Sequence, residues 1–110
     1  MIQERTFDEL IEGLDAFDRR MTHALKRLRG RQQVLAIQTS RFELCRLLGV
    51  EYDADQAARI DESLARLAKT PLQRRGPQSG FSIATRAVTA VRQEEGSEKL
   101  TILLGRLYAL

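Results

Sequence analysis

The sequence predicts an all-α protein: a four- or five-helix antiparallel bundle whose long N-terminal helix is either continuous or kinked. Apolar residues recur at helical spacing from residue 7 to residue 28. The only prolines, Pro71 and Pro77, stand in one segment, so the preceding residues lack the strongest helix breaker. Patterns typical of helix ends recur along the chain. The chain has 110 residues, so we expect one helical domain, 1–110, with a flexible loop at 70–80.

The first helix is expected to begin at a capping box formed by Thr6 and Glu9. The apolar residues that follow are three and four positions apart in alternation: Phe7, Leu10, Leu14, Phe17, Met21, Ala24 and Leu28. A repeat of 3.5 residues is typical of a helix that packs in an antiparallel bundle.

The sequence leaves two possible positions for the end of this helix. Gly30 could break it, but a glycine within a helix costs only about 1 kcal/mol. Leu35 and Phe42 continue the apolar seam of Leu28, which favours one long helix. Ser40 and Glu43 form a second possible capping box, so the helix could also restart there.

Further helices are expected in the second half of the chain. Gly49 is placed as a C-terminal cap, and Asp53 with Gln56 as a new helix start. The inward residues of that helix would be Ala57, Ile60, Leu64 and Leu67. After the loop, one helix is expected from Ser82 to Gly96 and another from Ser97. A short strand through residues 101–104 is the alternative for the last segment.

A basic run, RRMTHALKRLRGRQQ at 19–33, holds six positive charges and no negative one. It is interpreted in three ways: as a solvated helix face, as a surface that pairs with an antiparallel copy of the chain, or as a face that binds nucleic acid phosphates. For the third, the candidate residues are Arg19, Arg20, Lys26, Arg27, Arg29 and Arg31, helped by Arg74 and Arg75.

Residues 44–50, LCRLLGV, resemble the first helix and turn of a helix-turn-helix. The second helix of that motif enters the major groove of DNA. Here the residues after the turn include Glu51, Asp53 and Asp55, and carboxylates disfavour contact with phosphates. A bundle turn capped by Gly49 is therefore the preferred interpretation.

The sequence offers little for catalysis, so we expect that the protein is not an enzyme. His23 is the only histidine and Cys45 the only cysteine. One of each cannot form a four-ligand zinc site, and neither stands in a pattern typical of a catalytic nucleophile. We expect no metal, no cofactor and no small-molecule substrate.

The expected function is contact with other proteins. A long helix would present more apolar surface than a chain of this length can cover, and the last segment is apolar nearly all round. We therefore expect an adaptor, a chaperone-like protein or a regulatory subunit that also forms a homodimer. The expected contact residues are Phe42, Leu47, Ile102, Leu104, Tyr108 and Leu110.

The compartment expected from the sequence is the cytoplasm. The N-terminal residues do not form the pattern of a signal peptide, and no apolar run approaches the ~18 residues that a bilayer requires. No membrane partner is expected. Binding of nucleic acid through the basic run at 19–31 is the alternative function.

Overall fold

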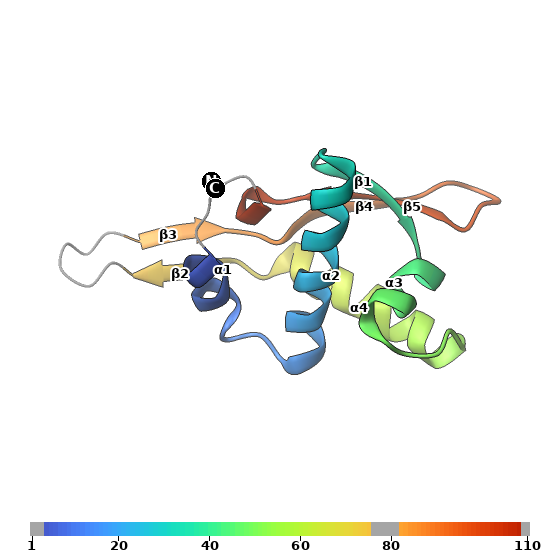
Figure 1. Cartoon of the computed structure of the whole chain (residues 1–110), viewed down its shortest axis with the longest axis horizontal. Coiled ribbons are helices and arrows are strands. Elements are labelled where there is room, and N and C mark those ends of the chain that lie inside the picture. The colour runs from blue at the N-terminus through green and yellow to red at the C-terminus, as the bar shows by residue number, and fades with distance from the viewer. Residues whose placement is uncertain (1–3, 76–81, 109–110) are drawn as a thin grey trace.

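A computed structural model describes residues 4–75 and 82–108, and these form a mixed α/β fold (Figure 1). The helices are α1 (Glu4–Ile11), α2 (Ala16–Gln32), α3 (Arg41–Leu48) and α4 (Ala54–Lys69). One antiparallel sheet contains β1 (Ala36–Ser40), β5 (Lys99–Leu104) and β4 (Val88–Gln93), in that order, and β2 (Leu72–Arg75) pairs with β3 (Ser82–Thr85). A short 3-10 helix, η1 (Arg106–Tyr108), follows. The prediction of an all-α bundle is therefore wrong.

The long N-terminal helix is also a wrong prediction. α1 and α2 are separate helices, and Asp15 caps the start of α2 by accepting a hydrogen bond from the Asp18 backbone N–H at 2.8 Å. α2 ends at Gln33, whose φ of 60° is left-handed. The apolar seam nevertheless faces the core in both helices, because Phe7, Met21 and Leu28 are buried. Beyond Gln33 the chain is extended and enters β1, so the seam does not continue to Phe42.

The helix ends predicted at Gly49 and Asp53 are confirmed, and the break left open at Ser40 is present. Ser40 accepts from the Glu43 N–H and begins α3, and Asp53 accepts from the Gln56 N–H and begins α4. Gly49 ends α3 with a φ of 74°, a conformation that glycine adopts without strain. On α4, the expected inward residues Ile60, Leu64 and Leu67 are buried.

The two helices expected after residue 82 are wrong, because this part of the chain forms β3, β4 and β5. β5 lies between β1 and β4, and its buried residues Leu100, Ile102 and Leu104 alternate with more exposed neighbours. This alternation turns one face of the sheet towards the helices. The strand considered as the alternative at residues 101–104 lies within β5.

Within the flexible loop expected at 70–80, residues Leu72–Arg75 form the strand β2. Residues 76–80 lie outside the described residues. The β2–β3 pair extends from one end of the molecule, and the turn between β4 and β5 lies at the other (Figure 1).

A buried ion pair joins α2 to α4. The Asp18 side chain is 6% exposed and accepts hydrogen bonds from the Arg66 guanidinium at 2.9 and 3.0 Å. The Ser63 hydroxyl donates to the same carboxylate at 2.5 Å. Three donors satisfy this buried charge, which fixes the two helices against each other.

The free edge of β1 is closed by a side chain. The Gln32 amide donates to the Gln38 carbonyl at 2.7 Å and accepts from the Gln38 N–H at 2.9 Å. The two bonds copy those that a neighbouring strand would make, so Gln32 takes the place of a strand at this edge.

Candidate nucleic-acid interface

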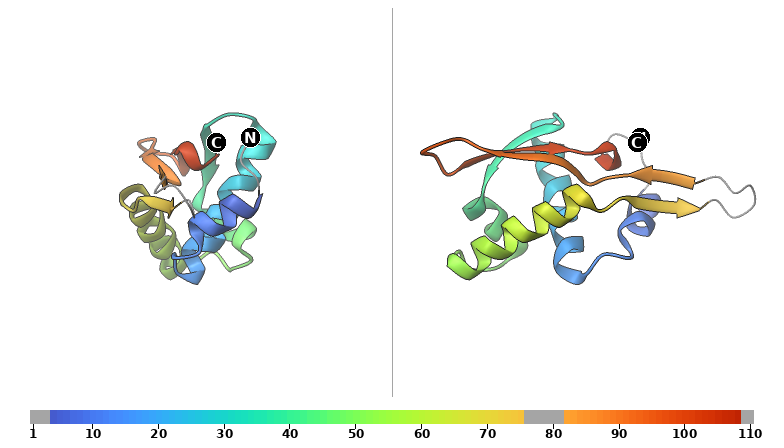
Figure 2. Two further views of the ribbon diagram at one scale, coloured as in Figure 1. Left: turned by 90° about the vertical axis from the view of Figure 1, so that its left-hand side faces the viewer. Right: turned by 180° about the vertical axis from the view of Figure 1, so that it is seen from behind.

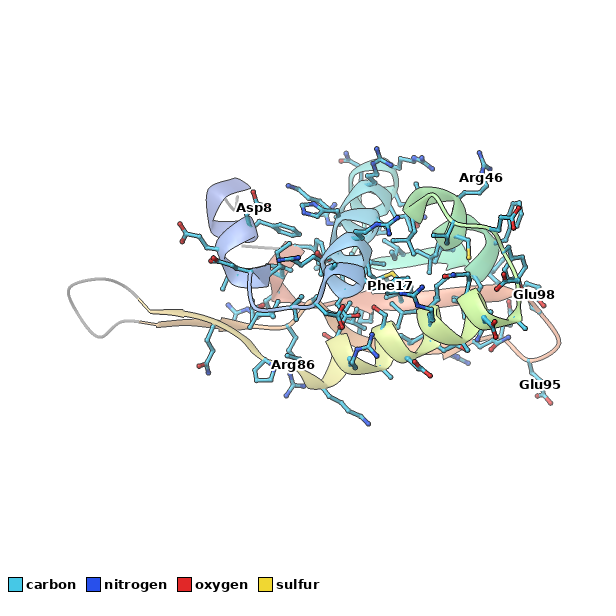
Figure 3. All side chains as sticks on the ribbon, turned by 90° about the horizontal axis from the view of Figure 1, so that it is seen from below. Asp8, Phe17, Arg46, Arg86, Glu95 and Glu98 are labelled. Atoms are coloured by element: carbon cyan, nitrogen blue, oxygen red, sulfur yellow. The ribbon has the colours of Figure 1, made fainter. Side chains whose placement is uncertain are left out.

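The basic residues of α2 lie on its solvent side because the opposite side carries the core residues. Met21, Leu25 and Leu28 are fully buried, whereas Arg19, Arg20 and Arg27 are exposed. We call the resulting surface the basic face. It consists of Arg19, Arg20, His23, Lys26, Arg27 and Arg31 on α2, with Arg46 on α3. Figure 3 shows Arg46 pointing outward from α3, on the same side of the molecule as the outer surface of α2.

A surface groove runs through the basic face where α2 meets the end of α3. Its volume is about 400 Å³, and its lining residues are Arg20, His23, Ala24, Arg27, Leu47 and Leu48. The guanidinium of Arg20 donates a hydrogen bond to the Leu48 carbonyl. That contact places a positive charge at the C-terminal end of α3, where the helix dipole favours it.

The basic residues of this face differ in the contacts that their side chains make. His23 Nε2 lies 3.9 Å from Asp8 Oδ1, and Arg31 Nη1 lies 3.9 Å from Glu43 Oε2. Both pairs are exposed, so they contribute little energy. Lys26 Nζ lies 4.6 Å from the centre of the Phe7 ring, a cation–π contact.

Among the described residues, three arginines of the basic face form neither a hydrogen bond nor an ion pair through their side chains. Within residues 4–75 and 82–108, Arg19, Arg27 and Arg46 have no acidic partner. Their guanidinium groups are therefore available for an external anion.

The remaining basic candidates lie elsewhere. Arg29 is half-buried on the flank of α2, and its Nε has no hydrogen-bond partner. Arg74 and Arg75 belong to β2, which extends from the far end of the molecule, and their side chains lie outside the described residues. The structure thus brings together most of the cations of the run at 19–31, but it does not bring β2 to the same surface.

α3, a turn at 49–53 and α4 follow one another where the sequence resembles a helix-turn-helix. The turn residues Glu51 and Asp53 are exposed, as are Asp55 and Glu62 on α4. Two arginines of α4 are already engaged: Arg59 lies over the Phe17 ring at 4.4 Å, and Arg66 binds Asp18. At the far end of the sheet, the turn between β4 and β5 adds Glu94, Glu95 and Glu98, of which Figure 3 labels the last two. This surface is therefore acidic, in contrast to the basic face.

The residues expected to contact a protein partner are divided between surface and core. Phe42 is 53% exposed, and Leu47 is half-buried in the groove of the basic face. Ile102, Leu104 and Tyr108 are buried, so none of the three presents a contact surface. The Tyr108 hydroxyl donates to the Thr22 carbonyl at 2.9 Å, and burial raises the pKa of this phenol. Leu110 lies outside the described residues.

Cys45 is buried in the core of the domain. Burial, followed by the nearby charge of Asp53, raises the pKa of its thiol. A raised pKa disfavours the thiolate that a nucleophile or a metal ligand requires.

Sequence reasoning missed two surface residues. Arg46 extends the basic face onto α3, and helical spacing could not place it there because the angle between α2 and α3 is a tertiary feature. Tyr52 packs edge-on against Phe42, with ring centres 5.8 Å apart. Two aromatic residues ten positions apart gave no signal for this contact.

Comparison with known proteins found no matching family model, curated protein or solved structure. Among the described helices, none is long and apolar enough to cross a lipid bilayer.

Proposed function

We propose that this protein binds nucleic acid, and that the basic face holds the phosphate backbone. The observation that carries the proposal is the row of outward basic residues on α2, together with Arg46 on α3. Within the described part of the chain, the side chains of Arg19, Arg27 and Arg46 form neither a hydrogen bond nor an ion pair. Arginine forks match phosphate geometry, and a groove between two helices can follow a sugar–phosphate strand. This is a binding function rather than a catalytic one, and it fits the cytoplasmic compartment expected from the sequence.

The order of elements supports the same proposal. A helix, a strand, two helices joined by a tight turn and a β-hairpin follow one another in α2, β1, α3, α4 and β4–β5. This order, with β2 and β3 inserted, is similar to that of winged helix-turn-helix domains, many of which bind DNA. A similar order of elements does not determine function, so the proposal rests on the charges.

The charges favour the basic face over α4 as the contact surface. Were α4 inserted into the major groove, Asp55 and Glu62 would approach phosphates, and both are exposed. The glutamates of the β4–β5 turn would add to the repulsion. We therefore propose that contacts to the backbone, which carry no sequence information, dominate binding.

The test is fluorescence anisotropy with a labelled mixed-sequence duplex, titrated at several salt concentrations. Arg19 and Arg27 have no described partner, so the double variant Arg19→Glu/Arg27→Glu leaves the fold intact. Each lost phosphate contact makes the negative slope of log affinity against log salt shallower by about 0.9, so we expect its magnitude to decrease by about 1.8. Affinity at low salt should fall at least tenfold.

The matched control is Lys99→Glu/Arg106→Glu, which makes the same change in net charge at exposed positions of β5 and η1. We expect this control to weaken binding far less. Equal losses in the two double variants would show that only net charge matters, and they would contradict the proposal. Absence of any binding at low salt would also reject it.

Contact with a protein partner is the second candidate function, and the exposed aromatic pair favours it. Phe42 and Tyr52 are 53% and 45% exposed, and the Tyr52 hydroxyl lies 3.4 Å from Glu98 Oε2. Tyrosine and phenylalanine are enriched at protein interfaces. If this pair binds a partner, Phe42→Ser should abolish its co-purification, whereas Leu103→Ser, at another exposed apolar position, should retain it.

A further inference from the structure

The outer edge of β4 carries backbone groups that the sheet does not use. The Glu94 N–H donates to the Lys99 carbonyl at 3.3 Å, which closes the turn between β4 and β5. Hydrogen-bonded and non-bonded pairs alternate in an antiparallel ladder. The Arg92–Thr101 pair is therefore bonded, and the Val91–Ile102 pair is not. The N–H and C=O of Val91 thus point away from β5.

No described strand covers this edge, because β4 is the last strand of its sheet. Every residue from 89 to 93 is exposed, including Val91 at 40%. The other edge of the sheet is different, because the Gln32 side chain satisfies the outward groups of Gln38 there. The middle of one edge is thus occupied by a side chain whereas the other edge is open, and an open edge is a site for adding a strand.

An apolar groove lies beside the open edge, between β4 and α4. Its volume is about 290 Å³, and its lining residues are Asp61, Leu64, Ala65, Ala68, Lys69 and Val91. Figure 2 shows α4 and β4 on one side of the molecule and α2 with α3 on the other. The groove is therefore separate from the basic face.

The groove carries one acidic and one basic residue, placed so that two copies related by a two-fold axis would bring opposite charges together. Asp61 and Lys69 lie one helical turn on either side of Ala65, which is exposed and small. If two α4 helices cross in antiparallel orientation at Ala65, Asp61 of each copy meets Lys69 of the other. Such a contact uses the same patch twice, as closed dimers do.

We propose that β4 is the dimerisation edge of this protein and that its occupant is a second copy of the same chain. The two β4 strands pair antiparallel about Val91 and join two three-stranded sheets into one sheet of six strands. The side chain of Val91 and the groove beside α4 are covered in the same step. The proposal is independent of nucleic-acid binding, because the two surfaces do not overlap.

Sedimentation equilibrium tests this proposal with two matched variants. Val91→Asp places a charge at the open edge, whereas Leu103→Asp places one on the outer face of the neighbouring strand, where Leu103 is 43% exposed. We expect Val91→Asp to raise the dimer dissociation constant at least tenfold and Leu103→Asp to leave it unchanged. Ala65→Glu, on α4, should also weaken the dimer and does not touch the sheet.

Amide hydrogen exchange gives a second measurement on the wild-type protein. The Arg92 amide is bonded within each copy, so it should exchange slowly at every protein concentration. The Val91 amide should exchange slowly in the dimer and fast after dilution. A wild-type monomer at every concentration would overturn the proposal, as would a dimer that Val91→Asp and Ala65→Glu leave intact or a Val91 amide that exchanges fast in the dimer.

Discussion

At the scale of single residues, we expect the Asp18 carboxylate to contribute strongly to the stability of the fold. Its carboxylate is buried, and its oxygens accept from Arg66 and Ser63. Hydrogen bonds to a charged group contribute about 1.5–3 kcal/mol, and Arg66 is partly exposed, which weakens its share. We expect Asp18→Asn to lower the free energy of unfolding in urea by about 2 kcal/mol. Glu95→Gln, an exposed control, should change it by less than about 0.5 kcal/mol.

The same carboxylate makes stability depend on pH. Burial raises the pKa of Asp18, but the hydrogen bonds from Arg66 and Ser63 and the charge of Arg66 outweigh burial, so the net pKa is lowered. A lowered pKa in the folded state stabilises the protein above the usual carboxyl pKa, and this contribution is lost as the pH falls through the folded value. The stability gap between wild type and Asp18→Asn should be full near neutral pH and shrink below about pH 4. A gap that widens on acidification would contradict this account.

At the scale of elements, two glycines are expected to respond in opposite directions to alanine. Gly30 lies within α2, and a methyl group there would meet no atom within 4 Å. Gly30→Ala should raise the free energy of unfolding by about 0.8 kcal/mol, because alanine favours the helix. Gly105 follows β5, where a methyl group would overlap the Arg86 backbone carbonyl. Gly105→Ala should destabilise by about 2 kcal/mol, which thermal unfolding would measure.

The helical elements could be predicted from the sequence better than the strands. The signals that mark helix ends are local, so the sequence predicts the caps Gly49 and Asp53 correctly and offers Ser40 as a possible helix start. The spacing of buried residues in α1 and α2 was also correct, although the helix around Asp15 was not continuous. A seam can stay in phase across a break, so periodicity alone does not prove one helix.

The strands were missed because their stability comes from pairing across long stretches of chain. Ile37 of β1 pairs with Ile102 of β5, and the residues around either position do not indicate this pairing. In β5, Leu103 is apolar although it faces outward, which obscures the alternation of its neighbours. The spacing of Ile83, Ala87 and Val91 fits a helix as well, so tertiary pairing overrode the local pattern. The α2 part of the basic face, by contrast, depends only on helical spacing within α2 and is predictable from the sequence, whereas the position of Arg46 on α3 is not.

At the scale of the whole molecule, the basic face and the open edge of β4 lie on opposite sides. If both proposals hold, a dimer presents its two basic faces in opposite directions and can hold two separate duplexes. We expect the wild-type protein to retain a labelled duplex on beads that carry a second duplex. Val91→Asp should bind a single duplex with unchanged affinity but lose this bridging. Bridging that survives in Val91→Asp would argue against the back-to-back arrangement.

The Gln32 amide has a consequence for how far such an assembly can grow. With both outer strands of the dimer sealed by glutamine, addition of strands stops at two copies. Gln32→Ala should expose the Gln38 backbone groups on both outer strands. Further copies could then add to these strands and form a polymer, which would be seen as light scattering that rises over time. Gln38→Ala removes a glutamine side chain from the neighbouring strand but keeps the seal on its backbone, so its solutions should stay clear. A single side chain would then determine whether this protein remains a discrete particle or becomes a fibre.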